Sequence, residues 1–196
     1  MKKAIGLYVA LVAALIPALA QAVTFHPLIG FGAEFGGDKL LSVTYSDGSK
    51  SDVYAGQGFS AFGGVAAQGL IDLSPITLDL QATLGVKYST ISDASNASLD
   101  YFRFPLELLA FVHWRDLRVG AGPVYHFGNS FTGSGTLSPY TFTFDNAFGV
   151  TAQADYTFGQ HWNIGVRFTS ITYQSPSNGI GKTNGDNVGG ELSYFL

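Results

Sequence analysis

The chain has 196 residues and a formal net charge of −4, it contains no cysteine, and 12% of its residues are charged. That charged fraction is about half of the usual quarter. The acidic balance argues against nucleic acid as a partner, because neutralising phosphates requires clustered Lys and Arg. Without cysteine, disulfides cannot close the fold. The 25 glycines, 16 Phe and 10 Tyr are an unusual abundance for a soluble protein.

Residues 1–22 have the pattern of a secretory signal peptide. Lys2 and Lys3 form a basic start, an uncharged apolar stretch runs from Ala4 to Ala20, and Ala20-Gln21-Ala22 has the form of a cleavage site. A transmembrane helix is the alternative, but no basic anchor follows the stretch. We predict cleavage after Ala22 and a single domain over residues 23–196. Loss of the two lysines leaves 8 basic and 14 acidic residues, a net charge of −6.

Apolar and polar residues alternate with a period of two through the rest of the chain, which predicts strands with one apolar face. The pattern is clearest in Ile76–Ser89, where every second residue from Ile76 to Tyr88 is apolar and the residues between them are polar or, at position 85, glycine. The seven connections between the alternating segments predict eight strands, because no connection is assigned between Ile29–Phe35 and Leu40–Tyr45 and these two are counted as one. In chain order the segments are Ile29–Phe35, the hairpin of Leu40–Tyr45 and Asp52 to about Gly69, Ile76–Ser89, Tyr101–Trp114, Leu117–Phe127, Phe142–Tyr156, Trp162–Phe168 and Val188–Leu196.

The connections alternate in length, which is typical of transmembrane barrels with short periplasmic turns and long outer loops. The short ones are Leu70–Pro75, Arg115-Asp116 and Thr157–His161. The long ones are Ser46–Ser51, Ile91–Ser98, Gly128–Pro139 and Gln174–Gly185. Because no apolar run after Ala20 is long enough for a spanning helix, a closed barrel is the other structure that can span a bilayer. We predict an all-β, transmembrane, antiparallel up-and-down β-barrel of eight strands.

The positions of aromatic residues support this prediction. Trp114 and Trp162 adjoin short turns, which predicts a periplasmic aromatic girdle. Phe127, Phe142, Phe144 and Tyr173 are expected near the opposite rim. A two-residue turn at Arg115-Asp116 would pair Trp114 with Leu117, Phe111 with Gly120 and Leu109 with Gly122, so that large inward side chains face glycines.

With these features the chain resembles the small outer-membrane β-barrel superfamily, which includes the opacity-type surface proteins and the transmembrane domain of outer membrane protein A. The most specific part is the end, Glu191–Leu196, and Tyr101–Leu106 is similar to a segment common in such barrels. The resemblance implies that the barrel-assembly machinery recognises Leu192, Tyr194, Phe195 and Leu196 during insertion, although Leu196 stands where such families have a terminal Phe. It also implies the cell outer membrane, with its lipids and lipopolysaccharide as partners. We expect a monomer.

Five acids, four bases and a histidine are predicted to face the barrel interior. They could form a path for small solutes or a buried ion-pair network. The interior of an eight-stranded barrel is just wide enough for side chains, and buried charges must pair, so we favour the network. These residues are Glu34, Asp79, Lys87, Arg103, Glu107, Arg118, His126, Asp155, Arg167 and Glu191.

His126 near Asn129 and Ser130 suggests an enzyme, because outer-membrane lipid A deacylases are similar barrels with a His and a Ser close together. Ser130 would lie roughly 13 Å from His126 along an extended strand, too far for a general base. His26, His113 and His161 have no metal-ligand spacing. We predict no catalytic, cofactor or metal site, and a structural or surface-interaction role that the fold does not specify. A narrow pore or carrier, and a lipid A-modifying enzyme, are the alternatives.

Overall fold

The computed structural model describes residues 23–44, 48, 50–93, 97–135, 141–175 and 181–196. The predicted signal peptide, residues 1–22, lies outside the described residues. All of the regular elements in this part of the chain are strands. It contains no helix long and apolar enough to cross a membrane.

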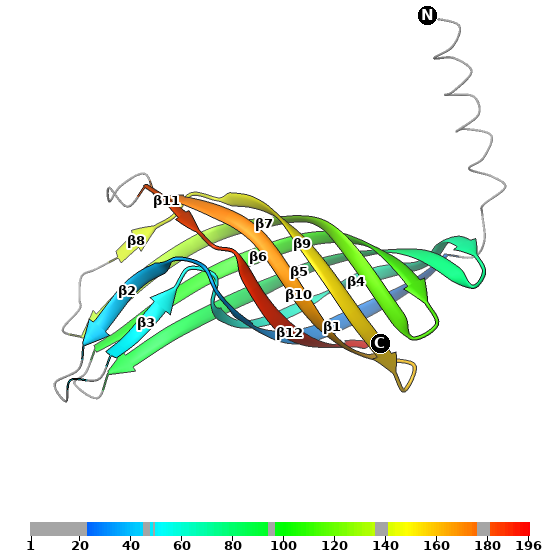
Figure 1. Cartoon of the computed structure of the whole chain (residues 1–196), viewed down its shortest axis with the longest axis horizontal. Coiled ribbons are helices and arrows are strands. Elements are labelled where there is room, and N and C mark those ends of the chain that lie inside the picture. The colour runs from blue at the N-terminus through cyan, green and yellow to red at the C-terminus, as the bar shows by residue number, and fades with distance from the viewer. Residues whose placement is uncertain (1–22, 45–47, 49, 94–96, 136–140, 176–180) are drawn as a thin grey trace, which may run out of the picture.

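Eight strands of the described chain form a closed ring (Figure 1). Each pairs antiparallel with the preceding and following member, and the last returns to the first with Phe195 opposite Leu28. The prediction of an eight-stranded up-and-down barrel is therefore confirmed. The strands are β1 (Thr24–Phe35), β4 (Gly58–Leu73), β5 (Ile76–Asp93), β6 (Ala97–Trp114), β7 (Leu117–Gly135), β9 (Ala147–Phe158), β10 (Trp162–Ser175) and β12 (Asn187–Phe195).

The two ends of the barrel differ. At the turn end, short turns join β4 to β5, β6 to β7 and β9 to β10, and β1 begins close to where β12 ends (Figure 1). At the opposite end, the loop end, β8 (Thr141–Thr143) lies beside β7 and β11 (Gly181–Asn184) lies beside β10. There β2 (Lys39–Thr44) and β3 (Lys50–Tyr54) form a separate two-stranded sheet.

The prediction of one strand from Asp52 to Gly69 was wrong, because the chain divides it into β3 and β4. Ala55, Gly56 and Gln57 leave the sheet between them. A Cβ on Gly56 would stand 2.7 Å from the carbonyl oxygen of Asp186, so only glycine allows this close approach. Opposite it, Gly37 has a φ of 84°, a conformation that glycine adopts without strain. Glycines thus turn the hairpin away from the barrel wall.

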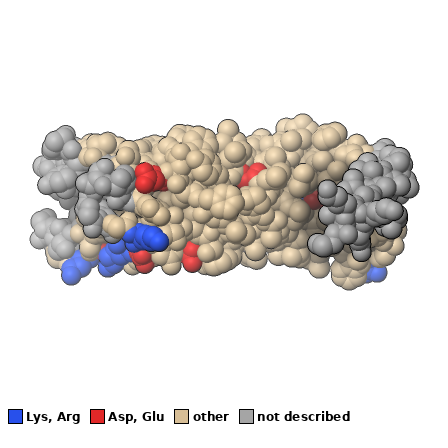
Figure 2. Space-filling view, turned by 90° about the horizontal axis from the view of Figure 1, so that it is seen from above, with Lys and Arg blue, Asp and Glu red and all other residues tan. Residues whose placement is uncertain are grey.

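The outer surface of the barrel wall is apolar. Large hydrophobic side chains on every barrel strand point outward, and Phe31, Phe59 and Phe148 are 64%, 71% and 69% exposed. Figure 2 shows a long stretch with only isolated acidic side chains, while Lys and Arg gather mainly at the loop end. Because adjacent residues of a strand face opposite sides, the same alternation that exposes these side chains buries the polar ones.

The predicted register between β6 and β7 is confirmed at its turn end. Trp114 pairs with Leu117 and Phe111 pairs with Gly120. A Cβ on Gly120 would lie 2.5 Å from Cδ1 of Phe111, so the glycine leaves the space that the ring fills. Large and small inward residues therefore complement each other across these strands.

Beyond His126 the wall continues further than predicted, since β5 runs to Asp93 and β7 to Gly135. The predictions of loops over Ile91–Ser98 and Gly128–Pro139 were therefore too long, because parts of both ranges belong to strands. A bulge at Gly128, where φ is 62°, shifts the register between β6 and β7. It also reverses the alternation, because His126 is buried on one side of it and Asn129 and Phe131 are buried on the other.

Candidate functional site

The barrel interior contains the ten residues that the alternation placed there. All are buried, with an exposed fraction of 7% or less. Their side chains come from β1, β5, β6, β7, β9, β10 and β12, so the network crosses the lumen instead of following one strand. We call this set the lumen network.

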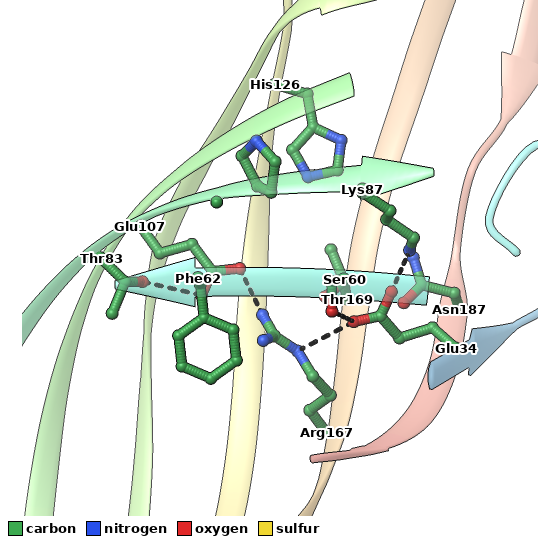
Figure 3. A pocket seen from close by; sticks show the side chains of 12 residues that line it. Glu34, Ser60, Phe62, Thr83, Lys87, Glu107, His126, Arg167, Thr169 and Asn187 are labelled. Atoms are coloured by element: carbon green, nitrogen blue, oxygen red, sulfur yellow. Dashed lines mark hydrogen bonds and ion pairs between the residues drawn. The ribbon is translucent and has the colours of Figure 1, made fainter. Parts of the chain in front are cut away.

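Arg167 is the centre of the network. Its Nη1 lies 3.0 Å from Oε2 of Glu191, its Nη2 contacts Oε1 of Glu107, and its Nε lies 4.0 Å from Oε1 of Glu34. Figure 3 shows the guanidinium between Glu107 and Glu34. Lys87 approaches Glu34 from the other side, with its Nζ 2.5 Å from Oε2. One arginine from β10 therefore links carboxylates of β1, β6 and β12.

A second group of the network lies nearer the turn end. Arg118 lies 3.4 Å from Oδ2 of Asp155 and donates a 3.0 Å hydrogen bond to Gln81, and its guanidinium stacks 4.1 Å from the ring centre of Phe111. Gln153 connects the two groups, because its Nε2 donates to Asp155 at 3.0 Å and to Glu191 at 2.5 Å.

Asp79 completes this turn-end group. Its Oδ2 lies 3.5 Å from Nδ1 of His113, and its Oδ1 accepts a 3.0 Å hydrogen bond from the backbone of Gly69.

Little open space is left inside. A cavity of about 20 Å³ lies beside Arg167, Lys87 and His126 (Figure 3), which is room for about one water molecule. Toward the turn end, Leu28, Ala66 and Phe195 form a buried apolar cluster against which Phe62 packs. The lumen at this level is packed with side chains.

Arg103 contacts the main chain instead of a carboxylate group. It is fully buried, its Nη1 donates to the carbonyl of Ala55 and its Nη2 donates to the carbonyl of Gln57. Lys87 donates a 2.7 Å hydrogen bond to the carbonyl between them, that of Gly56. Sequence reasoning missed this contact, and the glycines at 36, 37, 56 and 58 were the available signal that the chain could fold inward here.

The loop end of the lumen is filled by apolar and aromatic side chains, the loop-end cluster. Phe144 and Tyr173 lie at the loop end, near the rim where they were expected, but both are buried inside the lumen. Phe144 turns inward because residues 144–146 leave the ladder between β8 and β9, and Tyr173 lies on the inward face of β10. Phe142 has no described side chain. The cluster comprises Val53, Ala55, Leu99, Tyr101, Phe131, Phe144, Ala147, Ile171 and Tyr173.

His126 and Ser130 are not brought together. Nδ1 of His126 lies 2.6 Å from the hydroxyl of Tyr173, and Ser130 follows the Gly128 bulge, after which even-numbered residues of β7 face outward. Asn129 instead donates to the carbonyl of Asp145 at 2.9 Å. Within the described residues, no three or more His, Asp or Glu side chains form a group that could hold a metal ion.

The other residues singled out from the sequence lie at the turn end. Trp114 and Trp162 are exposed on the outer surface, and the ring of Trp162 meets that of Tyr194 edge-on with centres 4.8 Å apart. Phe195 points into the lumen and Leu196 points outward. Leu192 is also exposed. Their roles as girdle and assembly signal stay predictions.

Neither the protein-family models nor the curated proteins include a match to this sequence. Among solved structures, the chain is similar to Ail, the attachment invasion locus protein of Yersinia pestis. The TM-score is 0.51 at 7% identity, covering 88% of this chain and 97% of Ail. For the structure of Ail in complex with the heparin analogue sucrose octasulfate, the TM-score is 0.50 at 9% identity, covering 90% of this chain and 100% of Ail. The ring of paired strands and this likeness together show that the chain has the fold of the small outer-membrane β-barrels.

Proposed function

We propose that this protein is an integral outer-membrane barrel that acts through the surface of its loop end, without catalysis and without passing solutes. The observation that carries the proposal is a lumen filled by ion pairs and closed by apolar clusters, inside a wall whose outer surface is apolar. Such a wall is stable in a bilayer, where a closed barrel satisfies every backbone group. A filled lumen leaves the ends of the barrel as the surfaces for contact.

The loop end offers more of this surface than the turn end. Strands β5, β6 and β7 continue past the level of Phe102 with polar side chains outside, and Ser98 and Ser134 lie 2.7 Å apart on neighbouring strands. The β2–β3 hairpin adds Lys39, which pairs with Asp52 at 2.6 Å. Ail, which has the same fold, is described as an attachment invasion locus protein. That description supports a surface-contact role for a barrel of this shape.

The proposal includes the route and the surroundings of the protein. Export by the signal peptide of residues 1–22 would deliver the chain to the periplasm, and insertion by the barrel-assembly machinery would leave the turn end on the periplasmic side. The apolar wall would then contact outer-membrane lipids and lipopolysaccharide. Trp114 and Trp162 would lie at the periplasmic interface, where amphipathic rings are favoured.

Gel migration and labelling of intact cells test the proposal together. The unheated protein should recover with outer membranes and migrate differently from the boiled protein, because a closed barrel resists detergent unfolding. A membrane-impermeant amine reagent should modify Lys39 and Lys50 in intact cells but should not modify the buried Lys87. Recovery in the soluble periplasm, or modification of Lys87 as fast as Lys50, would contradict the proposal.

Conductance distinguishes this proposal from the pore alternative. Purified protein in a planar bilayer should give currents indistinguishable from those of protein-free detergent, because the space inside holds about one water. Reproducible unitary steps would establish a pore and overturn the closed-lumen proposal.

Lipid A analysis tests the enzyme alternative. Mass spectra of lipid A from cells that overproduce the protein should match those from cells that overproduce His126→Ala. A mass change that requires His126 would establish catalysis.

A further inference from the structure

Two buried cations, Arg103 and Lys87, bind a stretch of main chain at the loop end of the lumen. Arg103 donates to the carbonyls of Ala55 and Gln57, and Lys87 donates to the carbonyl of Gly56. Three successive carbonyls therefore share two buried cations. We call this arrangement the carbonyl clamp.

The chemistry of the clamp suits main-chain carbonyls. Carbonyls removed from water must be paired, and hydrogen bonds to charged donors are stronger than those between neutral groups. The planar guanidinium presents two donors in a fixed fork, which matches two carbonyls that flank a third. The side chain of Arg103 also lies 4.2 Å over the ring of Tyr101, so its direction is fixed from the wall of β6.

The clamped residues lead directly from the β2–β3 hairpin. That hairpin pairs with no barrel strand among the described residues, so its attachment depends on its base. There, Ala55 donates to the carbonyl of Asp38 at 2.8 Å and Gly56 donates to that of Gly36 at 3.0 Å. These bonds hold the two legs of the hairpin to each other. The clamp ties them to β5 and β6, beside a 3.1 Å hydrogen bond that Gln57 donates to Ser89 of β5. Asp38 and Asn184 also bond each other, at 2.7 and 2.8 Å.

We propose that Arg103 and Lys87 seat residues 55–57 as a plug in the loop end of the lumen and thereby fix the orientation of the β2–β3 hairpin on the barrel. The hairpin is part of the surface in the function proposed above, so the inference rests on that function for its biological meaning. The clamp itself is a property of the fold. Isolated two-stranded hairpins are marginally stable, and a tether from inside the barrel supplies the order that the hairpin lacks.

Trypsin reports on the clamp because the hairpin carries its own cleavage sites. Lys39 lies at the base of β2, and Lys182 in β11 provides a reference site on the same end. Cleavage of ordered chain requires local opening, and its rate follows the open population when closing is fast. The protein folded in lipid vesicles would be treated with trypsin, and fragments cut after Lys39 and Lys182 would be followed by mass spectrometry.

Arg103→Gln should speed cleavage after Lys39 by about tenfold or more, since two charged hydrogen bonds are lost, and Lys87→Gln should have a smaller effect. Arg118→Gln is the matched control, because Arg118 is as deeply buried but lies among Asp155, Gln81 and Phe111. It should leave the ratio of Lys39 to Lys182 cleavage unchanged. If Arg103→Gln does not fold, Arg103→Lys keeps the charge without the fork and should still raise that ratio.

An unchanged ratio in Arg103→Gln would overturn the clamp and show that other contacts, such as burial of Val53 and Ala55 and the hydrogen bond from Gln57 to Ser89, seat the plug. An equal rise in Arg118→Gln would overturn it as well, because any lumen cation would then matter. The heat-dependent gel shift, measured on the same samples, reports separately on the barrel. A variant that keeps the shift but not the hairpin order separates the two proposals.

Discussion

Between the turn end and His126 the lumen holds ion pairs beside a small apolar cluster, whereas beyond His126 it is filled by the aromatic rings of Tyr101, Phe131, Phe144 and Tyr173. The outer surface changes in the opposite sense. On β6, Phe102 is exposed and Arg103 is buried, while two residues further toward the loop end Asp100 is partly exposed and Tyr101 is buried. The same strands are therefore apolar outside in one half and apolar inside in the other.

This reversal indicates where the apolar solvent ends. A wall that faces lipid carries its apolar side chains outward, and a wall that faces water buries them. We infer that lipid surrounds the barrel up to about the level of Phe102 and Phe148, and that the remaining strand ends fold as a water-exposed cap with its own core. Substitutions in the two halves should therefore act through different physical effects.

The largest effect should come from Arg167→Gln in the lumen network. The change leaves Glu34, Glu107 and Glu191 buried without their common guanidinium, and breaking a buried ion pair costs about 3–5 kcal/mol. We expect a loss near the upper end of that range, measured by urea unfolding in lipid vesicles with tryptophan fluorescence. Arg115→Gln, at an exposed turn position, should change little. A loss as small as that of the control would mean that the carboxylates are already neutral.

Phe131→Ala tests the cap. Phe131 is 1% exposed in the loop-end cluster, and removing a buried phenyl ring costs about 3 kcal/mol or more. The effect should concentrate in the cap, so amide hydrogen exchange should rise in Asn129–Gly133 and stay slow in Leu117–Tyr125. The exposed neighbour Thr132→Ala is the control. Equal exchange along the whole of β7 would show that the two halves unfold as one unit.

Gly120→Ala should lower the stability of the half nearer the turn end by a moderate amount. The added Cβ would stand 2.5 Å from Phe111 and 2.6 Å from the carbonyl oxygen of Ala110, and such overpacking costs about 1–3 kcal/mol. Gly63→Ala is matched to it, since the nearest atom there is 3.6 Å away. Unfolding free energies of the two variants should therefore differ. Identical values would mean that the ring of Phe111 moves aside freely.

The smallest effect should come from the hairpin pair Lys39–Asp52. The hydrogen bond from Lys39 holds the pKa of Asp52 below its ordinary value. Because the folded pKa is lowered, the stabilisation is present above the ordinary pKa of Asp, about 3.9, and is lost as the pH falls through the folded value. Lys39→Met should leave global unfolding at pH 7 unchanged and remove this acid dependence from amide exchange in β3. An acid dependence that persists would assign it to another group.

The barrel could be predicted from the sequence because alternation is a local signal that each strand repeats. The pairing of Phe111 with Gly120 followed from one turn length. The cap could not be predicted in the same way. The one-residue bulge at Gly128 reverses the faces of the rest of β7, so Phe131 points inward. Phe144 was misplaced because three residues leave the ladder before β9 begins.

The contact of Arg103 with residues 55–57 could not be predicted from the sequence for a related reason. The sequence shows a buried cation but not its partner, and charge counting supplies only carboxylates as candidates. Every residue carries a main-chain carbonyl, so no residue type in the sequence marks the partner of Arg103. The path of residues 55–57 into the lumen depends on glycine packing between segments that are far apart in the chain, such as Gly56 against Asp186.

Because the clamp recognises main-chain atoms, it places no demand of its own on the side chains of the hairpin it holds. In the function proposed above, hairpin positions outside the contact of Leu40 with the loop-end cluster can therefore change identity and charge while the clamp stays in place. Arg103 and the glycines beside the plug carry the constraint for all of them. The fold thus separates a segment that is free to diversify from the few positions that keep residues 55–57 seated.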